Sequence, residues 1–365
     1  MRRAELAAWL RLLLTPGVGN QSARQLLGAF GLPEAVFAQT QAALQTVVGP
    51  RLATALQSEP EDLAPQVERL DTWLAQDPQH HVLTLADPLF PPDLLQMADP
   101  PLLIYVVGDV QALHHPRRLA IVGSRNPTPQ GQANARQFAR ALGEAGVCVV
   151  SGLALGVDGA AHEGALEASA PTVAVVGTGV DRVYPKRHLE LAHRIGRQGA
   201  IVSEYPLGTP PLAQNFPNRN RLIAGLSQGT LVVEAALQSG SLITARLAAE
   251  QGREVFAIPG SIHAPQSRGC HALIRQGAKL VESAQDILED LHMVDRAERA
   301  AVEDTDPTLH TSLLDAMGFD PVGLDALQAR TGLDTATLQA QLLDLELAGS
   351  VGRLPGGLLQ RVGQG

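Results

Sequence analysis

Residues 147–179 read VCVVSGLALGVDGAAHEGALEASAPTVAVVGTG, and this stretch indicates the fold. It begins with a short apolar run, passes through a glycine-containing turn into a helical pattern, and returns to a second apolar run that again ends in glycines. Short apolar runs without polar alternation are typical of parallel strands that are buried on both faces. The stretch therefore predicts a strand–helix–strand unit of a parallel sheet.

The same pattern recurs on both sides of this unit, so that six or seven apolar runs alternate with helical stretches. This alternation predicts an α/β domain with an extended Rossmann-like parallel sheet that is covered on both faces. The expected strands are Leu119–Val122, Val147–Val150, Val173–Val176, Ala200–Val202, Leu231–Val233, Val255–Ile258 and Lys279–Val281, and the expected helices lie at about 130–145, 156–168, 186–198, 219–227, 241–252 and 284–291.

The segments on either side of this core, residues 69–290, predict two smaller domains. Residues 1–68 form helices, and the break at Pro16-Gly17-Val18-Gly19 resembles a helix-hairpin-helix or SAM-like module, with a weaker second copy at Gly49-Pro50-Arg51. Glycines in such hairpins let backbone N–H groups approach a phosphate. A small helical docking domain fits the same pattern equally well, because this region is acidic.

The C-terminal segment begins with an acidic linker at 291–307 and continues to residue 365. Residues 308–365 show three short helical patterns and then two apolar runs around a Pro-Gly-Gly turn, which predicts a winged-helix-like domain. The third helix carries Asp334, Asp344 and Glu346 but no Lys or Arg. Because a groove-reading helix needs basic residues, we favour a protein-interaction role for this domain over DNA reading.

Composition and charge describe a soluble globular protein with a basic centre. Hydrophobic residues make up 45% of the chain and charged residues 18%, and the net charge is −9. Residues 101–288 carry 17 Lys or Arg against 13 acidic residues, whereas both ends are acidic. No secretion signal or membrane-spanning stretch stands out, and the two cysteines suggest no disulfide framework, so we expect a cytoplasmic protein without a membrane partner.

Glycines, hydroxyls and cations follow five successive expected strands. The carboxyl ends of parallel strands form the ligand-binding edge of such a sheet. Glycines and helix N-termini bring backbone N–H groups close to an anion there, and Arg or Lys adds full charge. The predicted phosphate-binding residues are Gly123, Ser124, Arg125, Ser151, Gly152, Lys186, Asn218, Arg219, Asn220, Arg221, Ser241 and Thr244.

The anion is not expected to be a dinucleotide, ATP or a metal complex. The first strand is followed by Gly-Ser-Arg instead of G-x-G-x-x-G, and Arg182 stands where the 177–179 loop would need its third glycine. Walker, HExxH and zinc-ligand spacings are absent, so we expect neither a cofactor nor a metal. Tyr184 and Phe216 adjoin the charged loops and could stack bases of single-stranded DNA, although packing onto the sheet is an equal alternative for both.

These loops, in their order along residues 70–290, resemble the DNA-processing protein A family, also called DprA or Smf. The flanking helical and winged-helix-like segments fit a three-part form of that family. The resemblance is carried by GSR at 123–125, SGLA at 151–154, DGAAH at 158–162, GTG at 177–179, YP at 184–185, FPNRNR at 216–221, IAGLS at 223–227, GSLITA at 240–245 and FAIPG at 256–260.

The resemblance implies a non-enzymatic protein that forms homodimers and binds incoming single-stranded DNA during natural transformation. It also implies that the strand is protected and is handed to the RecA recombinase past single-strand-binding protein, while binding of duplex DNA stays open. By the same resemblance, Arg125 and Lys186 contact phosphates. Arg219 and Arg221 either contact phosphate or brace the pocket through buried hydrogen bonds.

A nucleotide-processing hydrolase is the alternative function. The segment from Gly229 to Glu234 faintly resembles the Gly-Gly-x-Gly-Thr…Glu loop of lysine-decarboxylase-like phosphoribohydrolases, in which a glutamate could activate water to break an N-glycosidic bond. Gln228 stands where that loop has glycine. We therefore favour a structural role for Glu234, paired with Arg219 or Arg221, and a similar pairing for Glu204.

Asp158 and His162 lie at i and i+4 of one expected helix and offer a second catalytic possibility. An acid–base or metal pair needs a third ligand or a nucleophile, and none is visible nearby in the sequence. We therefore expect a side-chain hydrogen bond that steadies the start of the helix.

Overall fold

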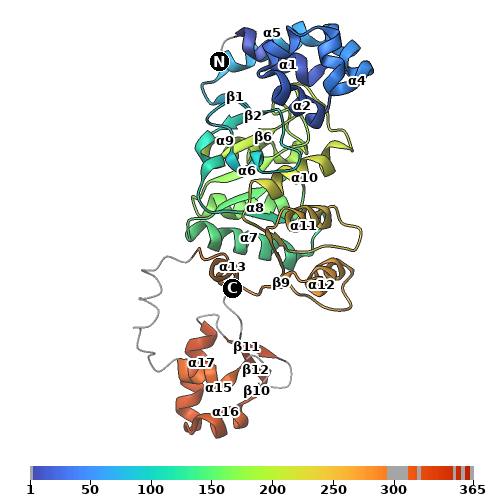
Figure 1. Cartoon of the computed structure of the whole chain (residues 1–365). Coiled ribbons are helices and arrows are strands. Elements are labelled where there is room, and N and C mark those ends of the chain that lie inside the picture. Colours follow the sequence, from blue (N-terminus) through green and yellow to red (C-terminus); the bar gives the residue numbers. More distant parts are fainter. Residues whose placement is uncertain (1–2, 294–310, 319–321, 348–350, 355–357, 362–365) are drawn as a thin grey trace. The chain divides into compact units, whose positions relative to one another are not determined.

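The computed structural model describes residues 3–293, 311–318, 322–347, 351–354 and 358–361 (Figure 1). The chain divides into two compact units, Met1–Met293 and Val294–Gly365. Among the described residues, the helices are all too short or too polar to cross a membrane. Most of the expected linker and the expected turn at 355–357 lie outside the described residues.

A nine-stranded sheet forms the centre of the larger unit and confirms the predicted Rossmann-like architecture. Its strand order is β1-β2-β6-β5-β4-β3-β7-β8-β9, and strands β3 to β9 run parallel to one another. Strand β2 pairs antiparallel with β6, and β1 pairs antiparallel with β2. The strands are β1 His80–Thr84, β2 Leu103–Gly108, β3 Arg118–Val122, β4 Cys148–Ser151, β5 Thr172–Val175, β6 Ala200–Ser203, β7 Gly229–Val232, β8 Glu254–Ala257 and β9 Lys279–Leu280.

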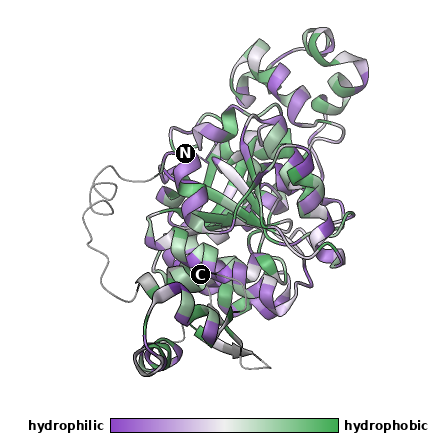
Figure 2. Ribbon diagram, turned by 90° about the horizontal axis from the view of Figure 1, so that it is seen from below, coloured by the Kyte–Doolittle hydropathy of each residue, from purple (hydrophilic) through white to green (hydrophobic). Residues whose placement is uncertain are grey.

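Alternate side chains of the strands face two different helical layers. Val122, Val150 and Val175 share a buried cluster with α10 Asn215–Gly225, α11 Ser241–Glu250 and α12 Arg268–Arg275, and the short α6 Pro92–Leu95 joins it. Ala174 and Val176 face the other way, toward α9 Leu189–Gln198. On that second face α8 Val157–Glu167 packs beside α9, and α7 Pro129–Glu144 packs beside α8. The central strands are mostly hydrophobic and the surrounding helices carry the polar surface (Figure 2).

Two helix boundaries differ from the expected ones. Helix α10 begins at Asn215, four residues before the expected start, so that the FPNRNR motif is the first part of a helix. Pro217 is compatible with this start because first-turn N–H groups have no partner within a helix. The expected helix at 186–198 is divided into a 3-10 turn, η2 Lys186–His188, and α9.

The N-terminal helices share a core with the sheet. Leu70 and Trp73, on the last of these helices, pack in one buried cluster with Tyr105 of β2. Both glycine turns noted in the sequence use the left-handed backbone region, since Gly17 and Gly49 have φ values of 84° and 79°. The side chain of Leu52, three residues after Gly49, lies against Gly17. The helices are α1 Arg3–Leu14, α2 Asn20–Phe30, α3 Pro33–Phe37, α4 Gln41–Gln57, kinked at Gly49, and α5 Leu63–Gln76.

The smaller unit is a winged-helix domain, as predicted. Leu327, Leu338 and Leu342 are buried at its centre, where the three helices meet the sheet. Asp334 accepts hydrogen bonds from the backbone and hydroxyl of Thr337 and so caps the third helix. The described elements are α15 Thr311–Met317, β10 Val322–Gly323, α16 Leu324–Thr331, α17 Thr335–Leu347, β11 Val351–Leu354 and β12 Leu358–Arg361, with sheet order β10-β12-β11.

Candidate functional site

A pocket of about 430 Å³ opens at the carboxyl edge of the sheet, where the strand order reverses. Strands β3 and β7 are neighbours, and the chain leaves them toward opposite faces of the sheet. Such a reversal separates the loops that follow the two strands and creates a crevice for ligands. Of the predicted phosphate-binding and stacking residues, the pocket is lined by Gly123, Ser124, Arg125, Phe216, Arg219, Asn220, Ser241 and Thr244.

Arg125 and two aromatic rings form a row along this edge. The Cζ atom of Arg125 lies 5.7 Å from the ring centre of Phe216, and that ring centre lies 5.6 Å from the ring centre of Tyr184. Arg125 and Tyr184 are exposed, as is Lys186 two residues further along the chain. Among the described residues, no carboxylate pairs with Arg125 or Lys186. Arg125 and Lys186 therefore form no salt bridge with any residue that the structure describes, although the Asp158 carboxylate in the lining of the same pocket interacts electrostatically with Arg125. Two stackable rings continue the row from Arg125.

Arg219 is the brace beneath the pocket. Its side chain is only 4% exposed, and one guanidinium nitrogen donates to the backbone oxygens of Gly152, at 2.6 Å, and Val175. Burial lowers the pKa of Arg219 to about 10, and the nearby Asp158 opposes this shift. Because these donors are already used to join the ends of β4 and β5, the geometry favours bracing over a direct phosphate contact.

Arg221 is likewise committed to the protein. It forms an ion pair with Glu204 and donates to the backbone oxygen of Asp99 at 2.7 Å. Burial raises the pKa of Glu204, and Arg221 opposes that shift. The pairing expected for Glu204 is therefore confirmed, and Arg221 has the bracing role.

Glu234 has a different partner from the one we expected. Its carboxylate accepts hydrogen bonds from the backbone N–H of Thr128, at 2.9 Å, and from the Thr128 hydroxyl, at 2.6 Å. Thr128 caps α7, so Glu234 fixes the start of that helix. The predicted pairing of Glu234 with Arg219 or Arg221 is wrong, because those arginines are already occupied by carbonyl oxygens and Glu204. Glu234 does not line the pocket.

Asp158 and His162 are buried helix residues, and Asp158 steadies the start of α8 as expected. Its carboxylate accepts the N–H of Ala154 at 3.2 Å, and burial raises its pKa while Arg219 opposes the rise. His162 contacts the hydroxyl of Thr172 at 2.8 Å, and burial lowers its pKa to about 3. A neutral imidazole that is fully enclosed cannot reach a ligand in the pocket.

The start of α11 forms the wall opposite Arg125. Gly240 precedes this helix without providing a side-chain cap, and the space beside its Cα is open. The Ser239 and Ser241 hydroxyls lie 2.7 Å apart at the same place. The first N–H groups of α11 already have acceptors, because Ser241 N–H donates to the Ser239 hydroxyl at 3.4 Å and Ile243 N–H donates to the Gly240 oxygen at 3.1 Å. The two serine hydroxyls are therefore the donors that this wall offers to an anion. Ser239 lines the pocket and was absent from the predicted residues, although its place in the SGS loop was a usable signal.

Some predicted contacts serve the fold instead of the pocket. Ser151 is fully buried and donates its hydroxyl to the Ile121 oxygen at 2.6 Å, so its assignment to phosphate binding is wrong. Gly152 is also buried, and a side chain at this position would collide with Arg219, so Gly152 is required to let the arginine pass. Asn218 is exposed on α10 outside the pocket.

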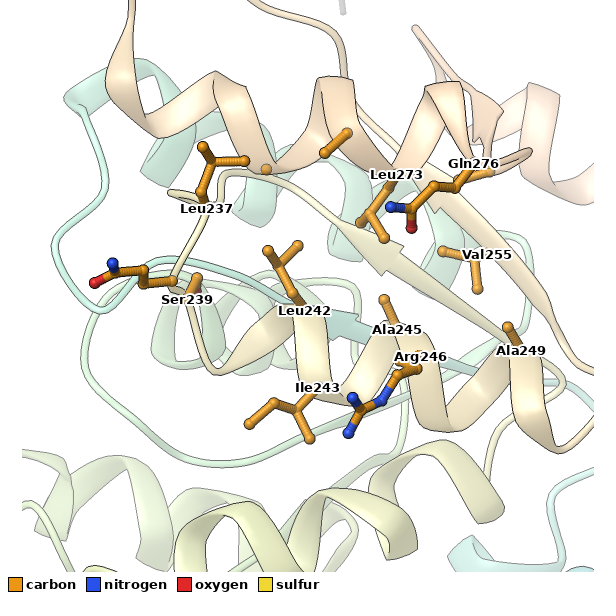
Figure 3. A pocket seen from close by; sticks show the side chains of 14 residues that line it. Leu237, Ser239, Leu242, Ile243, Ala245, Arg246, Ala249, Val255, Leu273 and Gln276 are labelled. Atoms are coloured by element: carbon orange, nitrogen blue, oxygen red, sulfur yellow. The ribbon is translucent and has the colours of Figure 1, made fainter.

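A second hollow between α11 and α12 has a different character. It is lined mainly by apolar side chains, including Leu242 and Leu273, and Arg246 is its one charged lining residue (Figure 3). Arg246 is paired with Glu250 along the same helix. This hollow therefore lacks the free charge of the sheet-edge pocket. Within the described part of the chain, no cluster of His, Cys, Asp or Glu could hold a metal ion.

Comparison with known proteins matches the same two regions. Residues 81–292 match the model of the family described as DNA recombination-mediator protein A, and residues 297–357 match the DprA winged helix domain. The chain belongs to the DNA processing protein A family. Protein Smf of Escherichia coli is 45% identical over 297 residues, covering 79% of each chain. DprA of Streptococcus pneumoniae is 46% identical over 207 residues, which cover 57% of this chain and 73% of that protein.

Two solved structures of the family resemble this one. DprA from Streptococcus pneumoniae superimposes with a TM-score of 0.67 at 35% identity, covering 79% of this chain and 98% of that chain. DNA processing protein A from Helicobacter pylori, whose structure describes a mode of single-stranded DNA binding, gives a TM-score of 0.53 at 33% identity over 58% of this chain and 95% of that chain. The family is thus involved in DNA processing.

Proposed function

We propose that this DprA-family protein binds single-stranded DNA by its phosphates at the carboxyl edge of the sheet, without altering it chemically. The row of Arg125, Phe216 and Tyr184 carries the proposal, because it places an unpaired cation beside two stackable rings. Lys186 adds a second exposed cation two residues beyond Tyr184, and the Ser239 and Ser241 hydroxyls at the start of α11 add donors. Phosphates would contact the cations and bases would stack on the rings, so sequence preference should be slight.

The cellular role that we propose follows the family. The protein protects DNA entering the cytoplasm during natural transformation and loads a RecA-type recombinase on it past single-strand-binding protein. Binding by phosphates supports this role, because it leaves base edges available to a recombinase. Homodimerisation would double the site and increase the effective concentration of phosphate contacts. The Glu234 carboxylate is hydrogen-bonded to Thr128 and does not line the pocket, which supports a binding protein over the N-glycosidic hydrolase.

Salt-dependent binding of an oligothymidine tests the proposal. For each phosphate that the protein neutralises, the logarithm of the single-strand binding constant falls by about 0.7 for every tenfold increase in salt concentration. Arg125→Ala and Lys186→Ala should each weaken binding to every sequence and reduce the slope by about 0.7. Arg140→Ala is the matched control, since Arg140 is an exposed arginine that pairs with Glu144 on α7. If both site variants bind with the parent's affinity and slope, the pocket has been assigned to the wrong ligand.

A further inference from the structure

The cations outside the pocket divide into paired and unpaired groups. On α7, Arg136 pairs with Glu163 and Glu167 of α8, and Arg140 pairs with Glu144. On α11, Arg246 is paired as well. By contrast, the segment from 181 to 198 holds five Lys or Arg against two acidic residues, and no ion pair within the described residues involves any of the five. These five are Arg182, Lys186, Arg187, Arg194 and Arg197.

These unpaired cations follow one continuous path away from the pocket. The path begins at Tyr184, whose ring lies beside Phe216 of the pocket wall, and runs through Lys186 and Arg187 of η2. It continues onto α9, which packs against the opposite face of the sheet from α10 (Figure 1). The path therefore leads from the pocket over the carboxyl edge and onto the second face.

Helix α9 presents its cations outward. Leu191 and Ile195 are buried against the sheet, whereas Arg194 and Arg197 lie on the exposed side. Residues three apart are neighbours on a helix surface, so the two arginines form one stripe. Glu190 is the only acidic residue of α9. From Leu189 to Arg197 the helix rises about 12 Å, which extends the positive surface well beyond the pocket.

We propose that a bound single strand extends out of the pocket, over η2, and along the exposed face of α9, where Arg194 and Arg197 contact its phosphates. This inference rests on the proposed function and adds the direction in which the strand leaves the site. Beyond Tyr184 the path has no Phe, Tyr or Trp, so it would hold the strand mainly by its backbone, and bases on this part of the strand would face solvent.

Binding of two oligothymidines distinguishes contacts in the pocket from contacts along α9. A strand of roughly 6 nucleotides is near the lower limit of a single-strand site, whereas one of roughly 20 exceeds its usual span. The double variant Arg194→Ala/Arg197→Ala should bind the short strand as the parent does. Its affinity for the long strand should fall about three- to tenfold per arginine, and the salt slope for that strand should fall by about 1.4. Arg140→Ala, an exposed arginine on the same face of the sheet, should change neither affinity.

Arg125→Ala distinguishes failure of this inference from failure of the proposed function. If Arg125→Ala weakens both strands while the α9 double variant binds the long strand normally, the path along α9 is wrong and the pocket stands. An equal loss for both lengths in the double variant would also overturn the path, because α9 would then act through the pocket itself. If Arg125→Ala weakens neither strand, the proposed function fails and the path with it.

Discussion

Replacing Arg219 by alanine should destabilise the protein instead of merely weakening DNA binding. The side chain is 4% exposed, and its bonds to the oxygens of Gly152 and Val175 join the ends of two adjacent strands. Truncation leaves both acceptors buried without a donor, at about 1–3 kcal/mol each. It also removes the positive charge beside Asp158. Loss of one member of a buried charge pair costs about 3–5 kcal/mol. Because the hydrogen bonds and the charge belong to the same guanidinium, the two costs overlap and are not added, and we expect a total of about 3–5 kcal/mol.

Thermal unfolding followed by circular dichroism measures this effect. A loss of 3–5 kcal/mol corresponds to a decrease in Tm of about 6–10 °C for a domain of this size. Arg125→Ala is the control, because this exposed arginine should lose DNA affinity and keep the parent's Tm. If Arg219→Ala has the parent's Tm but binds DNA more weakly, Arg219 contacts phosphate directly and the bracing role is refuted.

Two further changes test the stacking row and the buried histidine. Phe216→Ala should weaken oligothymidine binding by about 1–3 kcal/mol in fluorescence anisotropy at unchanged salt slope, because it removes stacking and no charge; an altered slope would contradict this role. Burial lowers the pKa of His162 from 6.5 to about 3 in the folded protein. Stability is therefore highest above pH 6.5, where the imidazole is neutral in both the folded and the unfolded chain. As the pH falls from 6.5 toward 3, the free energy of unfolding should decrease by about 1.4 kcal/mol per pH unit on account of this residue. Denaturant unfolding at several pH values should therefore show a shallower acid decline for His162→Gln than for the parent, and equal slopes would refute the assignment.

The sheet and its ligand-binding edge could be predicted from the sequence because both depend on local patterns. Apolar runs such as 147–150 are recognisable without tertiary information, and the carboxyl ends of parallel strands meet at one edge. Gly123, Arg125 and Ser241 follow such strands, and they line one pocket as this rule requires. The same patterns indicated the winged helix, although its expected turn lies outside the described residues.

The partners of charged residues could not be predicted, because they depend on burial and on distant segments. Arg125 and Arg219 look alike in sequence, yet one is exposed and the other is 4% exposed beneath the pocket. Glu234 is bound by Thr128, which is 106 positions away. Ser151 and Ser241 both lie in loops that the sequence marks as part of the ligand-binding edge. The Ser151 hydroxyl, however, donates to the Ile121 oxygen within the sheet. Residue type and spacing do not distinguish such a brace from a ligand contact.

A crystal structure of the protein with a bound oligothymidine would show directly whether the sheet-edge pocket holds a single strand by its phosphates. We expect phosphate oxygens within hydrogen-bond distance of Arg125, Lys186 and the first turn of α11. At least one base should stack on Phe216 or Tyr184 with its Watson–Crick edge toward solvent. A strand bound elsewhere, or one whose base edges are read inside the pocket while its phosphates face solvent, would contradict this expectation.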